Sequence, residues 1–194
     1  MKFKEITLVN FMRYKGKNTI RFSTDDRMNV TAILGNNTVG KTTIAQAFRW
    51  GLYGEVTTTN YTSKENAVLL NKEVIAEMGE RGTGEVCVEI ILSDKVGSSE
   101  REYKFVRRQS FKCPPTNPYS HDVVPVANAK LTVQISENGV PQEKGVIDDK
   151  INDRKEGYVQ SMINEFFPEK LSNYFFFDGE RWSDNNNKTE DIKK

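Results

Sequence analysis

The sequence is poor in the residues that most often bind metals or transfer protons. Its 194 residues include one histidine, His121, and two cysteines, Cys87 and Cys113. This supply argues against a zinc site and against histidine-based catalysis within the chain. Cys87 lies in the middle of the apolar pattern at 85–89, so we expect a thiol buried in the core rather than a disulfide. Such cysteine usage is typical of the cytosol.

Long apolar runs and a strong net charge are also missing. No apolar run reaches the roughly 18 residues of a membrane-spanning helix, and the first residues lack the apolar core of a signal peptide. We therefore expect a cytoplasmic protein without a membrane partner. The formal net charge of +1 provides no overall attraction to nucleic acid, which leaves only local basic patches.

The most informative segment is the octapeptide at 35–42, which fits the phosphate-binding pattern G-x-x-x-x-G-K-[ST]. Its glycines allow a tight turn that directs consecutive N–H groups into one concavity at a helix N-terminus. In such a loop the lysine reaches the β- and γ-phosphates, and the hydroxyl ligates Mg²⁺. The candidate nucleotide-binding residues are Gly35, Asn36, Asn37, Thr38, Val39, Gly40, Lys41 and Thr42, followed by Thr43.

The flanking sequence supplies the context that this motif requires. An apolar segment at 28–34 predicts a buried strand before the loop. The segment 43–52 predicts a helix with Ile44, Ala47, Phe48 and Gly51 on one face. The alternative is an ordinary glycine turn before a helix.

Periodicity predicts an α/β chain with many strands. Alternation predicts strands at 3–10, 17–22, 85–92, 102–111 and 130–136, with a turn at 137–139 and a surface loop at 112–128. Helices are predicted at 67–78, 146–154 and 157–167, the last ended by Pro168. The aromatic run at 173–177 predicts a fully buried strand that leads into Asp178, Gly179 and Glu180.

These segments, in this order, resemble the N-terminal lobe of an SMC-type ABC ATPase head. The resemblance rests on "ITLVNFMRYKGKNTIRF", "GNNTVGKTT", "AFRWGLYG", an apolar "VLLN" and "YFFFDGER". The last of these looks like the DndD-like and Lamassu-type antiphage SMC proteins, two groups that this sequence does not separate. The resemblance implies an α/β P-loop fold of the ABC/SMC head type, with a mixed sheet, an antiparallel β subdomain and helices. It assigns 1–182 to the lobe and the polar tail 183–194 to the start of a coiled coil.

The resemblance also implies roles for individual residues. Lys41 and Asp178 are the expected catalytic residues, and Thr42 and Asp178 the expected contacts of Mg²⁺. Asp178 occupies the place of a family glutamine, and with Glu180 it could instead form a turn or a helix cap. Arg13 stands one position later than the family arginine that approaches the nucleotide or DNA, and an exposed loop arginine is the alternative. Lys64 follows in a segment that returns toward the nucleotide in the family.

Such heads bind ATP with Mg²⁺ between two copies, and ATP closes the pair. The implied partners are the C-terminal lobe of the same head, a second head, DNA, and accessory or effector subunits of a defence or repair complex. The chain contains no "LSGG" signature, no strand ending in Asp-Glu and no heptads. We therefore expect a fragment that binds ATP with little turnover of its own, in a nucleoid-associated protein.

A basic cluster that could face DNA lies on the predicted hairpin, and its members are Lys104, Arg107, Arg108 and Lys112. A solvated sheet face is the favoured interpretation. Alternation along the strand sends Arg107 and Arg108 to opposite faces.

A P-loop kinase or GTPase acting on small molecules is the second functional class, yet Asn71-Lys72-Glu73-Val74 lacks the aspartate of a base-reading GTPase motif. A non-catalytic scaffold that uses ATP only to join subunits is the third.

Overall fold

The computed structural model describes residues 1–36, 39–56, 69–79, 82–113, 123–148 and 157–176. Within this part of the chain the central element is a seven-stranded sheet with the order β2-β1-β3-β4-β6-β7, to which β5 adds beside β4. The strands are β1 (Lys2–Val9), β2 (Lys17–Arg21), β3 (Thr83–Val96), β4 (Ser99–Lys112), β5 (Val124–Pro125), β6 (Lys130–Glu137) and β7 (Val140–Asp148). Every described pairing is antiparallel.

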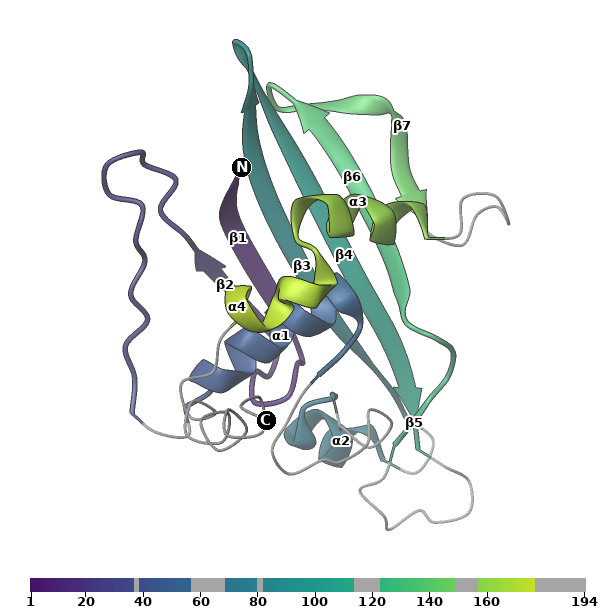
Figure 1. Cartoon of the computed structure of the whole chain (residues 1–194). Coiled ribbons are helices and arrows are strands. Elements are labelled where there is room, and N and C mark those ends of the chain that lie inside the picture. Colours follow the sequence, from purple (N-terminus) through teal and green to yellow (C-terminus); the bar gives the residue numbers. More distant parts are fainter. Residues whose placement is uncertain (37–38, 57–68, 80–81, 114–122, 149–156, 177–194) are drawn as a thin grey trace, which may run out of the picture.

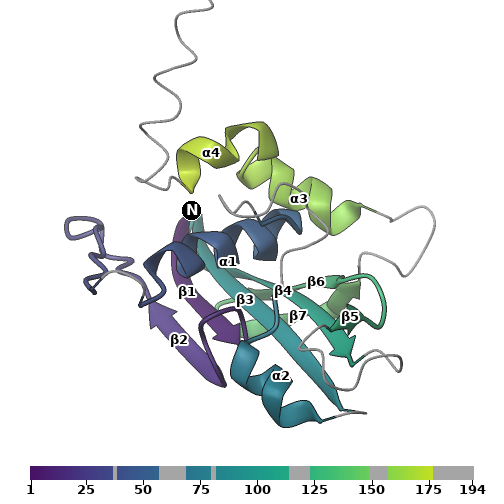
Figure 2. The ribbon, with the colours of Figure 1, turned by 90° about the horizontal axis from the view of Figure 1, so that it is seen from below.

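Helices cover one face of this sheet. They are α1 (Lys41–Tyr53), α3 (Tyr158–Phe166) and the short α4 (Ser172–Phe175), which follows the 3-10 turn Glu169–Leu171. Figure 2 shows all three on the same side of the sheet, and Figure 1 shows α2 (Lys72–Met78) near the end at which β3 begins. The α/β fold class expected from the sequence is therefore confirmed.

The two faces of the long β3–β4 hairpin differ because side chains alternate along a strand. Val88, Ile90 and Phe105 point toward the helices and are 0–1% exposed. The opposite face carries charged residues in cross-strand pairs: Lys104 lies 2.8 Å from Glu89, and Arg108 lies 3.4 Å from Glu85. One face therefore builds the core while the other is solvated.

Helix α1 approaches the sheet closely because one of its residues has no side chain. A Cβ at Gly51 would lie 2.7 Å from Ile90 Cδ1 and 2.9 Å from Val88 Cγ1, well inside contact distance. All four residues predicted for the apolar face of this helix, Ile44, Ala47, Phe48 and Gly51, are buried, which confirms that prediction. Gly54 ends the helix in a left-handed conformation, with φ 75°.

An aromatic cluster joins α1 to the last described segment. Phe176 stacks on Phe48 with ring centres 5.2 Å apart, and Phe3 of β1 stacks on Phe167 at 5.0 Å. Arg49 donates a hydrogen bond of 3.1 Å to the Phe176 carbonyl. The chain at 176 is thus anchored to the helix that begins at the candidate phosphate loop.

Most predicted strands and the helices at 43–52 and 157–167 are confirmed, with shifts of a few residues. Three predictions are wrong. Residues 28–34 form no strand, and residues 146–148 belong to β7 rather than to a helix. Of the aromatic run predicted as a buried strand at 173–177, residues 173–175 lie in α4 with Phe175 48% exposed, and residue 177 is outside the described part of the chain. The helix predicted from 67 begins only at Lys72, because Asn71 caps it. No helix among the described residues is long and apolar enough to cross a membrane.

Candidate nucleotide-binding site

The candidate site is built where the glycine-rich loop enters α1. Gly40 is the N-cap residue, with φ 106° and ψ 15°, a left-handed conformation that favours glycine. The first turn receives no side-chain cap, and the Ile44 N–H is the first to bond back, to the Gly40 carbonyl at 3.2 Å. Helix geometry therefore leaves the N–H groups of Lys41, Thr42 and Thr43 without an intrahelical acceptor, which is the arrangement that attracts an anion.

The two residues expected to act on phosphate and metal reach solvent. Lys41 and Thr42 are exposed, whereas Thr43 is 7% exposed and Ile44 is buried beneath them. The Lys41 ammonium group donates to the Gly35 carbonyl and, at 3.0 Å, to the Asn36 carbonyl. The lysine therefore lies over its own loop, close to the N–H groups that would bind the same phosphates.

The loop between β1 and β2 lies beside this site. The Tyr14 hydroxyl is 3.4 Å from the Gly40 carbonyl oxygen, to which it donates. Arg13 precedes Tyr14, the residue that contacts the phosphate loop. It is exposed, which agrees with the alternative interpretation of Arg13 as an exposed loop arginine. Lys15 instead pairs with Glu73 at 3.3 Å and Glu77 at 2.5 Å on α2, so it is directed toward α2.

Several predicted site residues are outside the described part of the chain. These are Asn37, Thr38, Lys64 and Asp178, together with the tail at 183–194. The roles assigned to them remain predictions. Of the described candidates, Gly35, Asn36, Val39 and Gly40 form the loop and Lys41, Thr42 and Thr43 open the helix.

The basic cluster on the β3–β4 hairpin requires a correction. Arg107 is 8% exposed and donates to the carbonyls of Gly51 and Leu52, each at 3.2 Å, and to Gln160 at 3.2 Å. It is therefore neither part of a DNA-facing patch nor part of a solvated face, because the last carbonyls of α1 attract a cation inward. Arg108 and Lys104 lie on the opposite face, as alternation predicted, in pairs with glutamates.

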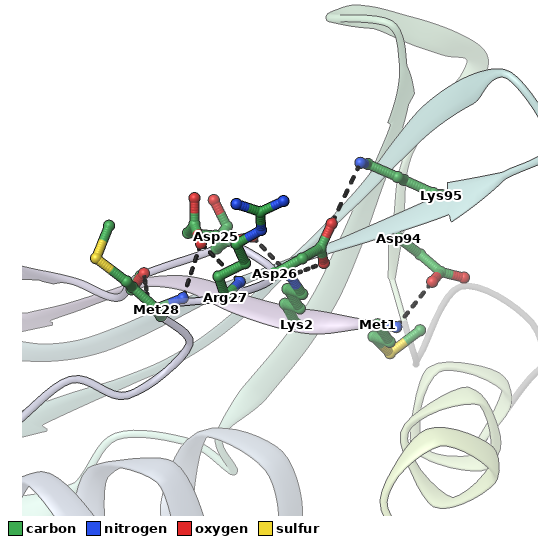
Figure 3. A network of polar contacts seen from close by, with 10 residues as sticks. Met1, Lys2, Asp25, Asp26, Arg27, Met28, Asp94 and Lys95 are labelled. Carbon is green, nitrogen blue, oxygen red and sulfur yellow. Dashed lines mark hydrogen bonds and ion pairs between the residues drawn. The ribbon is translucent and has the colours of Figure 1, made fainter.

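The segment before the phosphate loop is held in place but is not covered. Figure 3 shows Lys2 of β1 and Lys95 of β3 reaching Asp26, at 2.5 Å and 4.0 Å, and Asp25 accepting from the N–H groups of Arg27 and Met28, both at 2.7 Å. Beyond these contacts Met28 is 74% exposed, Val30 83% and Leu34 93%. The strand predicted at 28–34 does not form, because none of the described strands pairs with this segment.

Sequence reasoning missed two residues that shape the site. Tyr14 carries no local signal, since a single aromatic residue in a loop is unremarkable until its contact is known. Asn71 did carry one: Asn before Lys-Glu is an N-cap pattern, and its side chain accepts from Glu73 N–H at 3.0 Å and Val74 N–H at 3.3 Å.

An open helix N-terminus, an adjoining glycine loop and a lysine folded over it define a P-loop nucleotide-binding domain of α/β class. Comparison with family models agrees: residues 5–194 match the model described as an AAA domain. The chain therefore belongs to this family of P-loop ATPases, and the match supports the N-terminal region of an SMC-type ATPase. Family membership implies nucleotide binding, commonly with Mg²⁺, and ATPase activity in general. A search among curated proteins finds no match.

Proposed function

We propose that this chain is the ATP-binding N-terminal lobe of an SMC-type head that dimerises on ATP and couples hydrolysis to DNA binding or sensing. The observation that carries the proposal is the start of α1, where three N–H groups without an intrahelical acceptor stand beside the exposed side chains of Lys41 and Thr42. Antiphage defence by a DndD-like or Lamassu-type protein, or DNA repair, is the proposed setting, supported by the resemblance of "YFFFDGER" alone.

The residues present suit Mg²⁺ and a triphosphate. The anion would lie against the N–H groups of 41–43, Lys41 would leave the Gly35 and Asn36 carbonyls for the phosphates, and Thr42 would hold the metal. When bound, Mg²⁺ supplies charge neutralisation to the phosphate oxygens. Lys41 binds and orients the phosphates, and Asp178 is proposed to orient water.

The exposed apolar segment at 28–34 supports a C-terminal lobe as partner. Met28, Val30 and Leu34 lie in the seven residues before the loop, each more than 70% exposed. Apolar residues grouped in this way mark surfaces that another element covers. We propose that the C-terminal lobe pairs along this segment and completes the site.

The structure argues against the GTPase alternative, whose one candidate base-reading motif begins at Asn71. Asn71 would have to read a base, yet its side chain caps α2 and donates to the Met12 carbonyl at 2.8 Å. Its amide group is therefore committed within the fold. DNA binding through the β3–β4 hairpin loses support as well, because Arg107 is buried and its neighbours are paired with glutamates.

Sedimentation velocity tests the proposed dimerisation. We expect the complete head, with its C-terminal lobe present, to sediment faster with saturating Mg²⁺-ATP than without nucleotide, and we expect Lys41→Ala to remove the difference. GTP in place of ATP is the matched control. Equal sedimentation in all samples would count against ATP-driven pairing, and ATP turnover by the complete protein would exclude a purely scaffolding role.

A further inference from the structure

The loop at 10–16 is closed by two hydrogen bonds between its end residues. Asn10 accepts from the Gly16 N–H through its side chain at 2.8 Å, and its own N–H donates to the Gly16 carbonyl at 3.1 Å. Asn10 and Met12 both have left-handed backbones, with φ of 52° and 49°. Residues other than glycine hold such conformations only where the surroundings fix them. The loop is therefore rigidly preorganised.

The same loop is fastened to the segment that leads into α2. The Met12 N–H donates to the Leu69 carbonyl at 2.7 Å, and the Met12 carbonyl accepts from the Asn71 side chain at 2.8 Å. Phe11, the residue before Met12, is fully buried, and its ring centre lies 5.6 Å from that of Trp50. Both polar groups of the Met12 backbone are thus used, which accounts for its left-handed conformation.

What this rigid loop presents to the phosphate loop is the ring of Tyr14. If Gly40 had a Cβ, its three nearest atoms would all belong to Tyr14: Cε2 at 3.1 Å and Cζ and Oη at 3.3 Å. The ring therefore lies against the motif glycine that has a left-handed backbone, with φ 106°. A phenol is protonated at neutral pH, and burial raises the pKa of Tyr14 further, so its O–H is a donor toward the Gly40 carbonyl.

We propose that Tyr14 is a positioning residue of the phosphate loop, which holds Gly40 so that the N–H groups of 41–43 stay directed outward. The inference rests on the proposed nucleotide-binding function and adds a residue to it. Since the loop at 10–16 is bonded to Leu69 and Asn71, a displacement of α2 would reach Gly40 through Tyr14. Tyr14 contacts the loop at Gly40, so its proposed effect is on the geometry of the loop.

Three substitutions separate positioning from simple stabilisation. Tyr14→Ala removes the ring, Tyr14→Phe keeps the ring atoms nearest Gly40, and Tyr53→Ala is the matched control at the other end of α1. The Tyr53 hydroxyl donates to the Phe167 carbonyl at 3.1 Å, so its loss loosens the same helix away from the loop. Affinity for Mg²⁺-ATP is measured by calorimetry, with Lys41→Ala as the reference for lost phosphate binding, and amide hydrogen exchange is followed at 39–44.

We expect Tyr14→Ala to weaken Mg²⁺-ATP binding by about tenfold or more, with Tyr14→Phe within about twofold of wild type. We also expect Tyr14→Ala to speed amide exchange at Ile44, whose N–H bonds to the Gly40 carbonyl at 3.2 Å. Tyr53→Ala should change neither. Wild-type affinity and exchange in Tyr14→Ala would overturn the proposal, as would an equal affinity loss in Tyr53→Ala. If the wild type itself binds no ATP, the proposed function fails, and the exchange rates still decide whether Tyr14 holds the loop.

Discussion

At the scale of single residues, the arginine pair on β4 shows what sequence alone leaves open. Alternation correctly sent Arg107 and Arg108 to opposite faces, but it gave no means to tell which face was inside. Arg107 is inside because the Gly51 and Leu52 carbonyls at the end of α1 lie within 3.2 Å of its guanidinium group. Its partners are more than 50 residues away along the chain, so no local pattern contains them.

Replacing Arg107 by methionine should lower the free energy of unfolding by about 2–3 kcal/mol, because buried carbonyls lose a charged donor. Arg108→Met is the matched control on the same strand and should cost less than about 1 kcal/mol, since its ion pairs are exposed. Urea unfolding measures both. Equal losses would show that Arg107 contributes nothing beyond an ordinary surface cation.

Cys87 should make stability fall at alkaline pH. Burial raises the pKa of its thiol from 9.0 to about 11, so the unfolded chain releases this proton before the folded one. The contribution of the protonated thiol to the free energy of unfolding is therefore fully present below about pH 9 and is lost as the pH rises toward 11. Between pH 8 and 10 the free energy of unfolding should fall by about 1 kcal/mol more in wild type than in Cys87→Ala. Identical pH profiles would contradict a buried, neutral thiol.

At the scale of elements, the predictions succeeded where the two paired strands are neighbours in the sequence. The β3–β4 hairpin and the β6–β7 turn at Asn138 and Gly139, with φ of 50° and 79°, follow from local alternation and turn residues. The predictions failed at 28–34 and in the described part of 173–177, where apolar content predicted buried strands. A strand needs a neighbouring edge as well as apolar side chains, and neither segment has one among the described strands.

The close contact between α1 and β3 can be tested at Gly51. Alanine there favours helix by about 1 kcal/mol, but its Cβ would meet Ile90 Cδ1 at 2.7 Å. We expect Gly51→Ala to destabilise the protein by about 1 kcal/mol despite its propensity, because overpacking costs more.

Ile90→Val removes the Cδ1 atom that the new methyl group would strike. The double variant Gly51→Ala with Ile90→Val should therefore lose at least about 0.5 kcal/mol less than the sum of the two single variants. Thermal unfolding of the four proteins gives this coupling. Strict additivity would mean that the helix simply moves away from the sheet.

At the scale of the whole molecule, the phosphate loop is supported from three directions. The β1–β2 loop contacts Gly40 through Tyr14, the sheet lies beneath α1 at Gly51, and the last described segment reaches α1 through Arg49 and Phe176. The motif itself could be predicted from eight residues. Its supports could not, because each contact joins residues far apart in the sequence.

The central claim is that the start of α1 binds the phosphates of ATP through Lys41. Isothermal titration of Mg²⁺-ATP into wild type and into Lys41→Ala tests it most directly, with matched far-ultraviolet circular dichroism to show that both are folded. Lys41 is exposed, and among the described residues its hydrogen bonds go to its own loop, so the substitution should leave the fold intact. The account predicts that the dissociation constant rises by about tenfold or more in Lys41→Ala. An unchanged dissociation constant would contradict it.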